Sequence, residues 1–301
     1  MAVNIDFTLS YTGRKSDQHE IDFYDVADAL VGFQRYLALT TNLLVNNEII
    51  TQAPSLKNAR IYAVPPEEGN WKLLARVAIL SGPLAAVGGG VFAVGTAEKD
   101  TPVGNLGRSV YGYVVKEIVG VHPDYDKTIG EQYEDEKKKN PNFPDLSQSR
   151  LDSLVEKCHS AVYRMHRPIV ASRTAKEANI YYDDGRGDVK STGSINKDTF
   201  DYMAFNKKDT KDVVILGRVT SYNINTYKGR IYLPQEGRPI PFILHESARS
   251  SDNINLLAAS LAASARGMAG NVTDLRCFVL RTRSRTDRLK SLMILHVMPV
   301  P

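Results

Sequence analysis

The order of predicted elements in the last third of the chain constrains its fold more than any other feature. From Asp212 onward the sequence has three strand-like segments, one helical segment and two more strand-like segments. The strands are expected at residues 213–223, 227–233, 239–244, 275–282 and 289–298. The helix is expected at 252–266, capped by Asp252 and ended by Gly267. This order predicts a small five-stranded OB-type β-barrel with one helix, and an SH3-like barrel with an inserted helix is the alternative.

The first two thirds of the chain indicate a separate α/β region. In order, the expected elements are a strand at 7–11, a helix from Asp22, strands at 59–64 and 71–79, and helices at 104–119, 147–165 and 197–205. The β-α-β-β start predicts a small antiparallel sheet with the long helix on one face. A polar stretch at 122–144 is expected to be an exposed connection. The fold class is therefore α+β, with an N-terminal β-α-β-β region and added helices over 1–206 and the barrel over 207–301.

The long helix that starts near Asp22 has one clear apolar stripe. Its members repeat at spacings of three and four and are expected to face the sheet: Val26, Leu30, Phe33, Leu37, Thr41 and Leu44. Asp22 and Asp25 lie at the start of the helix. One carboxylate can cap a backbone N–H there, and both oppose the positive end of the helix dipole.

The composition, 43% hydrophobic and 24% charged, predicts a soluble globular protein, but one segment complicates this prediction. Residues 77–97 carry no charge over 21 positions, which is long enough for a helix that spans a bilayer. Five glycines and Pro83 argue against such a helix, because both residue types destabilise a helix interior. The favoured interpretation is a buried or loosely packed Gly/Ala-rich segment. A segment that inserts into a membrane only on activation is the alternative.

The nearly neutral charge balance argues against a protein that binds nucleic acid over its whole surface, while a local basic patch stays open. The chain has 38 lysines and arginines and 34 aspartates and glutamates, a net charge of +4. Its two cysteines, Cys158 and Cys277, form no C-x-x-C pair and are expected to be buried in a reducing compartment. The first residues are typical of a strand and lack the features of a signal peptide, so a cytoplasmic location is expected.

The sequence lacks the catalytic and metal-binding motifs that a single chain can reveal. It contains no G-x-x-x-x-G-K-[ST], G-x-S-x-G or H-E-x-x-H pattern. Its six histidines are scattered. His159 and His166 share a predicted helix but lie about 10 Å apart along its axis, too far for one metal ion. We therefore expect a non-enzymatic protein without catalytic residues, metal or cofactor, while a site assembled from distant residues stays open.

A basic cluster around the last predicted hairpin is the strongest candidate for a binding site. Arg281, Arg283 and Arg285 alternate along one strand, so their side chains would share a face. The candidate partner-binding residues are Arg276, Arg281, Arg283, Arg285, Arg288, Lys290 and Tyr227. On an OB-type barrel, such side chains can hold single-stranded nucleic acid or a protein partner. A solvated, arginine-rich hairpin without a partner is the third interpretation.

Parts of the sequence resemble a known family. The resemblance rests on residues 19–25 (HEIDFYD), 100–106 (DTPVGNL), 226–232 (TYKGRIY) and 283–291 (RSRTDRLKS). The chain is similar to an uncharacterised bacterial and phage family that pairs an N-terminal α/β region with a C-terminal five-stranded β-barrel. That family has no known activity. The resemblance therefore implies the two-domain architecture and, from the kind of family alone, a role in conflict between bacteria and phages.

Together these features predict a non-enzymatic binding and assembly protein. The N-terminal region would mediate self-association into a homo-oligomer, and the barrel would engage a protein partner through its arginine-rich hairpin. Two alternatives stay open. One is a membrane-perturbing effector that uses residues 77–97 in a conditional membrane contact. The other is a barrel that binds single-stranded nucleic acid.

Overall fold

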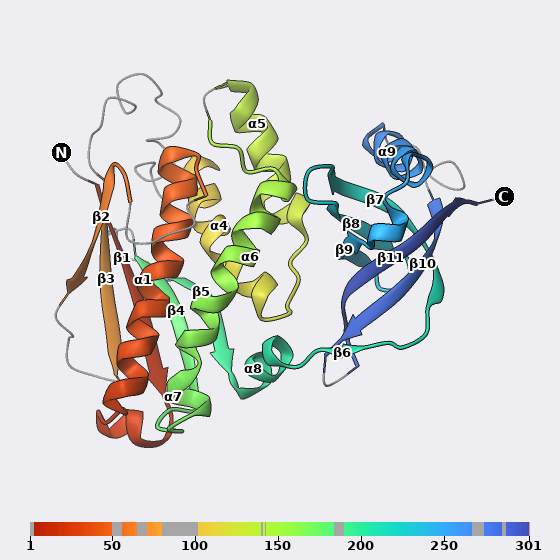
Figure 1. The fold of residues 1–301 in the computed structure, drawn as a ribbon. Coiled ribbons are helices and arrows are strands. Elements are labelled where there is room, and N and C mark those ends of the chain that lie inside the picture. Colours follow the sequence, from red (N-terminus) through yellow and green to blue (C-terminus); the bar gives the residue numbers. More distant parts are fainter. Residues whose placement is uncertain are drawn as a thin grey trace. The chain divides into compact units, whose positions relative to one another are not determined.

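A computed structural model describes most of the chain (Figure 1). The described residues are 3–49, 56–64, 71–79, 102–139, 141, 143–183, 190–266, 274–284 and 287–300. The chain forms two compact units, Met1–Phe200 and Asp201–Pro301. Each unit has its own sheet, and each is described by itself below.

One layer of the first unit is a five-stranded antiparallel sheet of order β2-β3-β1-β4-β5. Its strands are β1 (Val3–Thr12), β2 (Ala59–Val64), β3 (Lys72–Ile79), β4 (Glu177–Asp183) and β5 (Lys190–Asn196). Side chains alternate across it, so Phe7 and Leu9 of β1 are fully buried while Asp6 and Thr8 face outward. The sequence analysis missed β4 and β5. In β4 the same alternation buries Ala178, Ile180 and Tyr182.

Helices cover one face of this sheet (Figure 1). The helices of this unit are α1 (Phe23–Asn46), α4 (Pro102–Ile118), α5 (Glu131–Lys139), α6 (Gln148–Met165), α7 (Arg167–Val170) and α8 (Lys197–Ala204), with short helical turns η1 (Arg14–Gln18) and η2 (Asp126–Gly130). Of these, α1 and α4 contact the sheet strands directly. Aromatic contacts join the layers. The Phe7 and Tyr111 ring centroids lie 4.7 Å apart, and the Tyr36 hydroxyl donates a hydrogen bond of 3.0 Å to the Tyr111 carbonyl oxygen. These rings form the centre of the apolar core, where the burial of large side chains stabilises the fold.

Helix α1 begins as its sequence indicates and lies very close to α6. The Asp22 carboxylate accepts a hydrogen bond of 3.0 Å from the Asp25 N–H, which caps the first turn. A Cβ on Gly32 would lie 2.5 Å from the carbonyl oxygen of Ala161 in α6. Glycine at this position therefore permits the close approach of the two helices.

The polar stretch at 122–144 is not only an exposed connection, because it contains helix α5. Tyr133 of α5 is buried, and its hydroxyl lies 3.1 Å from an Asp145 carboxylate oxygen. Lys137 donates a hydrogen bond of 2.6 Å to the same hydroxyl. One buried aromatic side chain thus fixes a helix whose remaining surface is charged, and this explains why the polar composition suggested a loop.

The uncharged segment at 77–97 is described only at its start. Val77, Ala78 and Ile79 complete β3 and are buried in the sheet, while residues 80–97 lie outside the described part of the chain. Among the helices of the described residues, none is both long enough and apolar enough to cross a membrane.

The second unit is a closed five-stranded β-barrel, as predicted. Its strands are β7 (Val213–Asn223), β8 (Lys228–Leu233), β9 (Arg238–Leu244), β10 (Asp274–Arg283) and β11 (Leu289–Pro299). The strand order is β11-β9-β8-β7-β10, and β10 also pairs with β11, which closes the barrel. The pairing of β11 with β9 is parallel, whereas the other barrel pairings are antiparallel. A three-stranded meander, a helix and a hairpin joined in this way have the connectivity of the OB type.

The barrel helix and a short extra strand complete this unit. Helix α9 (Ser251–Ala265) follows the turn η3 (Glu246–Ala248) and is capped by Ser250 rather than by Asp252. Ser260 of α9 accepts a hydrogen bond of 3.0 Å from the Val219 N–H, which fixes the helix to β7. The two-residue strand β6 (Lys207–Lys208) pairs with the end of β10. With one sheet-and-helix unit and one barrel, the α+β fold class is confirmed.

Candidate interaction surfaces

The first arginine of the predicted basic cluster lies at the end of the inward-facing row of β10. Leu275, Cys277 and Val279 alternate into the barrel core, and Arg281 continues the same row. Its Nε donates a hydrogen bond of 2.7 Å to the carboxylate of Asp209. The Asp209 N–H in turn donates to the Arg281 carbonyl oxygen at 2.9 Å. The charge of Arg281 is therefore compensated inside the second unit by a residue that follows β6.

The hairpin between β10 and β11 contains a second internal ion pair. Arg283 donates a hydrogen bond of 2.6 Å to Asp287, and its Nε lies 4.0 Å from Asp209. Arg288 is exposed, with its guanidinium 5.8 Å from the centre of the Tyr202 ring. Arg285 lies outside the described residues. The hairpin thus presents less uncompensated positive charge than its sequence indicates.

Lys290 and Tyr227 also have internal contacts. The Lys290 ammonium donates to the carbonyl oxygens of Tyr202, Met203 and Phe205 and to the side-chain oxygen of Asn206, at 2.6, 3.3, 3.1 and 2.7 Å. Burial lowers the pKa of Lys290 to about 8. Tyr227 has a left-handed backbone (φ 55°) in the turn between β7 and β8, and the Arg249 guanidinium lies 4.5 Å from its ring centre. Both side chains support the fold of the second unit.

Arg276 differs from the rest of the cluster because it lies on the outside of the barrel. Within the described residues it makes no hydrogen bond or ion pair. Its register partners are Leu216 on β7 and Met298 on β11, which are 50% and 41% exposed. The neighbouring Phe278 pairs with exposed Val214. We call this surface the outer barrel face; its members are Val214, Leu216, Arg276, Phe278 and Met298.

A second apolar surface lies on the first three turns of α1. We call it the α1 face; its members are Phe23, Tyr24, Ala27, Leu30 and Val31. Phe23 is 85% exposed, Tyr24 70%, Val31 50% and Leu30 43%, and Ala27 is exposed as well. The prediction that Leu30 faces the core was wrong. The other members of the predicted stripe are buried, whereas the Leu30 side chain is exposed. Helix α1 therefore has two apolar sides, of which the sequence analysis recognised one.

The spacing of the α1 face was visible in the sequence. Residues 23, 27, 30 and 31 follow the i, i+4, i+7 and i+8 spacing of one helix side. A helix with apolar residues on both sides is normally buried on both sides. The outward side of α1 is instead open to solvent within the described residues, so it is a candidate interaction surface.

No site for metal chemistry emerges from the described residues. In this part of the chain, no group of three or more histidine, cysteine, aspartate or glutamate side chains could hold a metal ion. His166 of the His159–His166 pair is fully buried, and its Nδ1 donates a hydrogen bond of 2.8 Å to the Val162 carbonyl oxygen. That bond gives His166 a structural role.

Two family models match the chain. The model described as "Domain of unknown function (DUF7946)" matches residues 7–204, from β1 to the end of α8. The model described as "Family of unknown function (DUF7947)" matches residues 212–298, which contain the barrel strands. No curated protein and no solved structure matches the sequence.

Proposed function

Because the chain belongs to the DUF7946 family, whose description assigns no activity, we propose a function from its exposed surfaces: a non-enzymatic assembly protein that pairs with a second copy of itself. The α1 face carries this proposal. Four large apolar side chains at neighbouring positions on one helix side are open to solvent. Contiguous apolar surface of this kind marks interaction sites on soluble proteins.

The arrangement of the α1 face favours a second copy of the same chain as the partner. Ala27, the smallest side chain, lies at the centre, with Phe23 four residues before it and Val31 four residues after it. A two-fold axis beside Ala27 would place Phe23 of one copy opposite Val31 of the other, and Tyr24 opposite Leu30. Phe23 and Val31 are about 12 Å apart along the helix, so two antiparallel helices can pair over two turns. Such an interface is self-complementary, as two-fold symmetry requires.

Light scattering coupled to size exclusion tests this pairing on the full chain. We expect a dimer for the wild type and at least a tenfold weaker dimer for Val31→Glu, because the substitution places a charge in an apolar interface. Val31 is half-exposed in a single copy, so the variant should keep its fold. Tyr62→Glu is the matched control, since Tyr62 is 46% exposed on β2, away from the α1 face.

A cysteine substitution tests the position of the two-fold axis. Ala27→Cys should give a disulfide-linked dimer under mild oxidation, because the two copies of residue 27 would face each other. The native Cys158 and Cys277 are buried and free, so they should not interfere. Ser153→Cys, at an exposed position of α6, should stay largely unlinked. A monomeric wild type, or equal linking at both positions, would exclude this interface.

The outer barrel face supports a second function, the docking of a partner protein. Leu216 and Met298 flank Arg276 across three strands, and methionine, arginine and aromatic side chains are enriched at protein interfaces. A partner with an apolar surface and a carboxylate to pair with Arg276 fits this face. It differs from the predicted hairpin site, where Arg281 and Arg283 pair with Asp209 and Asp287.

A photo-crosslinking residue at position 216 tests the barrel as a docking site. In the native host we expect one dominant crosslinked protein, and Arg276→Glu in the same chain should abolish that crosslink because it reverses the only unpaired charge of the face. A crosslinker at Asn225, in the exposed turn between β7 and β8, is the control. Salt-sensitive retention of single-stranded DNA or RNA, without a protein crosslink at 216, would favour the nucleic-acid alternative instead.

The remaining expectations stay predictions. The buried, free cysteines support our proposal of a cytoplasmic location, because such thiols persist in reducing compartments. Membrane perturbation by residues 77–97 depends mostly on positions outside the described residues. A role in conflict between bacteria and phages depends on the family resemblance alone.

A further inference from the structure

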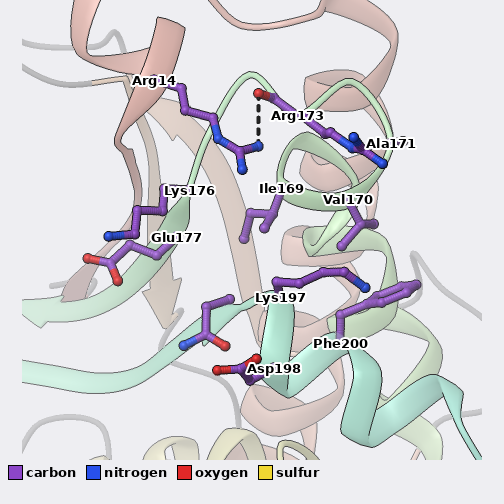
Figure 2. A pocket seen from close by; sticks show the side chains of 11 residues that line it. Arg14, Ile169, Val170, Ala171, Arg173, Lys176, Glu177, Lys197, Asp198 and Phe200 are labelled. Carbon is purple, nitrogen blue, oxygen red and sulfur yellow. Dashed lines mark hydrogen bonds between the residues drawn. The ribbon is translucent and has the colours of Figure 1, made fainter.

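The first unit contains an open pocket with a strongly basic lining (Figure 2). Its volume is about 650 Å³, within the range of small-molecule sites. Its charged lining residues in the described chain are Arg14, Arg173, Lys176, Lys197, Glu177 and Asp198. Four cations thus face two carboxylates, so the pocket carries excess positive charge although the whole chain is nearly neutral.

Two of these cations have no partner within the described residues. The guanidinium of Arg173 and the ammonium of Lys176 make no hydrogen bond or ion pair there. Arg14 uses one guanidinium nitrogen to donate to the Arg173 carbonyl oxygen at 3.2 Å, and Figure 2 shows the rest of its guanidinium turned toward Ile169 in the middle of the pocket. These groups are therefore available to an anion, unlike the paired arginines of the barrel hairpin.

The backbone around the pocket is held in an uncommon conformation. Both Arg14 and Arg173 have left-handed backbones, with φ of 63° and 57°. Residues other than glycine rarely adopt this conformation, and such positions cluster at binding sites. The preceding Gly13 has φ 82°, and a Cβ there would lie 2.5 Å from the Cβ of Lys176. This glycine lets the Arg14 turn lie directly against the segment that carries Lys176.

The floor of the pocket is apolar, and one wall is the first turn of α8. Ile169, Val170 and Phe200 supply the apolar surface. Asn196 precedes α8, and its side-chain oxygen accepts from the Thr199 N–H at 3.0 Å while the Thr199 hydroxyl accepts from the Asn196 N–H at 2.8 Å. This reciprocal cap fixes the helix start, so Lys197 at the first helical position is held at the pocket edge.

We propose that this pocket binds a small phosphorylated molecule, with the phosphate at the Arg14 guanidinium and the body of the ligand against Ile169, Val170 and Phe200. Figure 2 shows the Arg173 guanidinium on one side of Arg14 and the Lys176 ammonium on the other, so both add positive charge around the phosphate position. A guanidinium group can donate two parallel hydrogen bonds to two phosphate oxygens, and a lysine ammonium adds a further positive charge. Apolar surface beside a few polar side chains is a common composition of a ligand site. The site is separate from the α1 face and the outer barrel face, so it adds a ligand to the proposed assembly function.

Calorimetric titration of the full chain with inorganic phosphate, pyrophosphate and AMP tests this proposal. Saturable binding of pyrophosphate or AMP is expected, weakened at least tenfold in the double variant Arg173→Gln/Lys176→Gln. Lys138→Gln, which removes an exposed lysine of α5 far from these lining residues in the sequence, should bind as the wild type does. AMP binding that exceeds phosphate binding would show that the apolar floor contributes.

Hydrogen exchange locates the site without relying on a variant. Bound pyrophosphate or AMP should slow amide exchange at residues 171–177 and 197–200 and leave the barrel strands unchanged. The proposal is overturned if none of the three probes binds saturably, if the double variant binds as tightly as Lys138→Gln, or if protection appears only in the second unit. These outcomes do not depend on the oligomeric state, so they separate this proposal from self-association.

Discussion

Asp25→Ala should lower the free energy of unfolding by about 3 kcal/mol, because it removes two hydrogen bonds of about 1.5 kcal/mol each to a buried, charged acceptor. Asp25 is only 3% exposed, and one carboxylate oxygen accepts from Arg167 Nε at 2.9 Å while the other accepts from the Ser172 N–H at 2.9 Å. Burial alone would raise the pKa of Asp25, but the hydrogen bonds from Ser172 and Arg167 outweigh it and the pKa is lowered. Alanine would leave both donors without this acceptor.

Asp28→Ala is the matched control for Asp25→Ala. Asp28 lies on the same helix and near the same arginine, 3.7 Å from Arg167 Nε, but its side chain is 26% exposed. An exposed pair contributes at most about 1 kcal/mol, so this variant should lose much less stability. Trp71 is the only tryptophan and belongs to the first unit, so its fluorescence during urea unfolding reports on this unit. Equal losses in both variants would contradict the importance of the buried pair.

His166 should make the first unit less stable as the pH falls from 7 to 5. Burial lowers the pKa of His166 to about 4 from its ordinary value of 6.5, and nearby His159 contributes in the same direction. The unfolded chain then binds a proton below pH 6.5 that the folded chain does not bind until about pH 4. The stability is complete above pH 6.5 and declines toward pH 4, with a loss of about 2 kcal/mol between pH 7 and pH 5.

The comparison with His166→Gln isolates this histidine from other titrating groups. Glutamine cannot titrate, so the variant should be less stable than the wild type at pH 7 because a hydrogen bond to Val162 is altered, yet should lose less stability on acidification. Urea unfolding followed by Trp71 fluorescence at pH 7, 6 and 5 provides the measurement. Identical pH slopes in the two proteins would show that folding does not lower the pKa of His166.

Local patterns predicted the barrel well because most of its strands are neighbours in the sequence, joined by turns or by the one helix α9. The first sheet was harder, because β1 pairs with β4 more than 160 residues later, and no local pattern shows that Phe7 lies opposite Tyr182. The helix α5 was missed because only one of its buried side chains, Tyr133, is apolar, and the rest of the segment is polar or charged. Periodicity identifies candidate elements, whereas pairing depends on contacts between distant segments.

The candidate surfaces also depended on contacts between distant segments, which local sequence patterns do not reveal. Alternation correctly indicated that Arg281 and Arg283 lie along one strand. It could not show that Asp209, which follows β6, would pair with Arg281. The alternation along β10 did contain usable information. Arg281 is an even number of residues from the apolar Cys277 and Val279, so its side chain lies on the same, inward side of the strand. Arg276 is an odd number of residues from Cys277 and Val279, and this spacing could have identified its side chain as pointing out of the barrel.

The parallel pairing of β11 with β9 has a consequence for synthesis on the ribosome. Until β11 has emerged, both β9 and β10 have an unpaired edge, and the buried side chains Leu292 and Ile294 are missing from the core. Exposed strand edges readily pair with other chains. We therefore expect the nascent barrel to expose two unpaired strand edges until β11 pairs with both β9 and β10. In the closed barrel those edges are no longer available to a neighbouring chain.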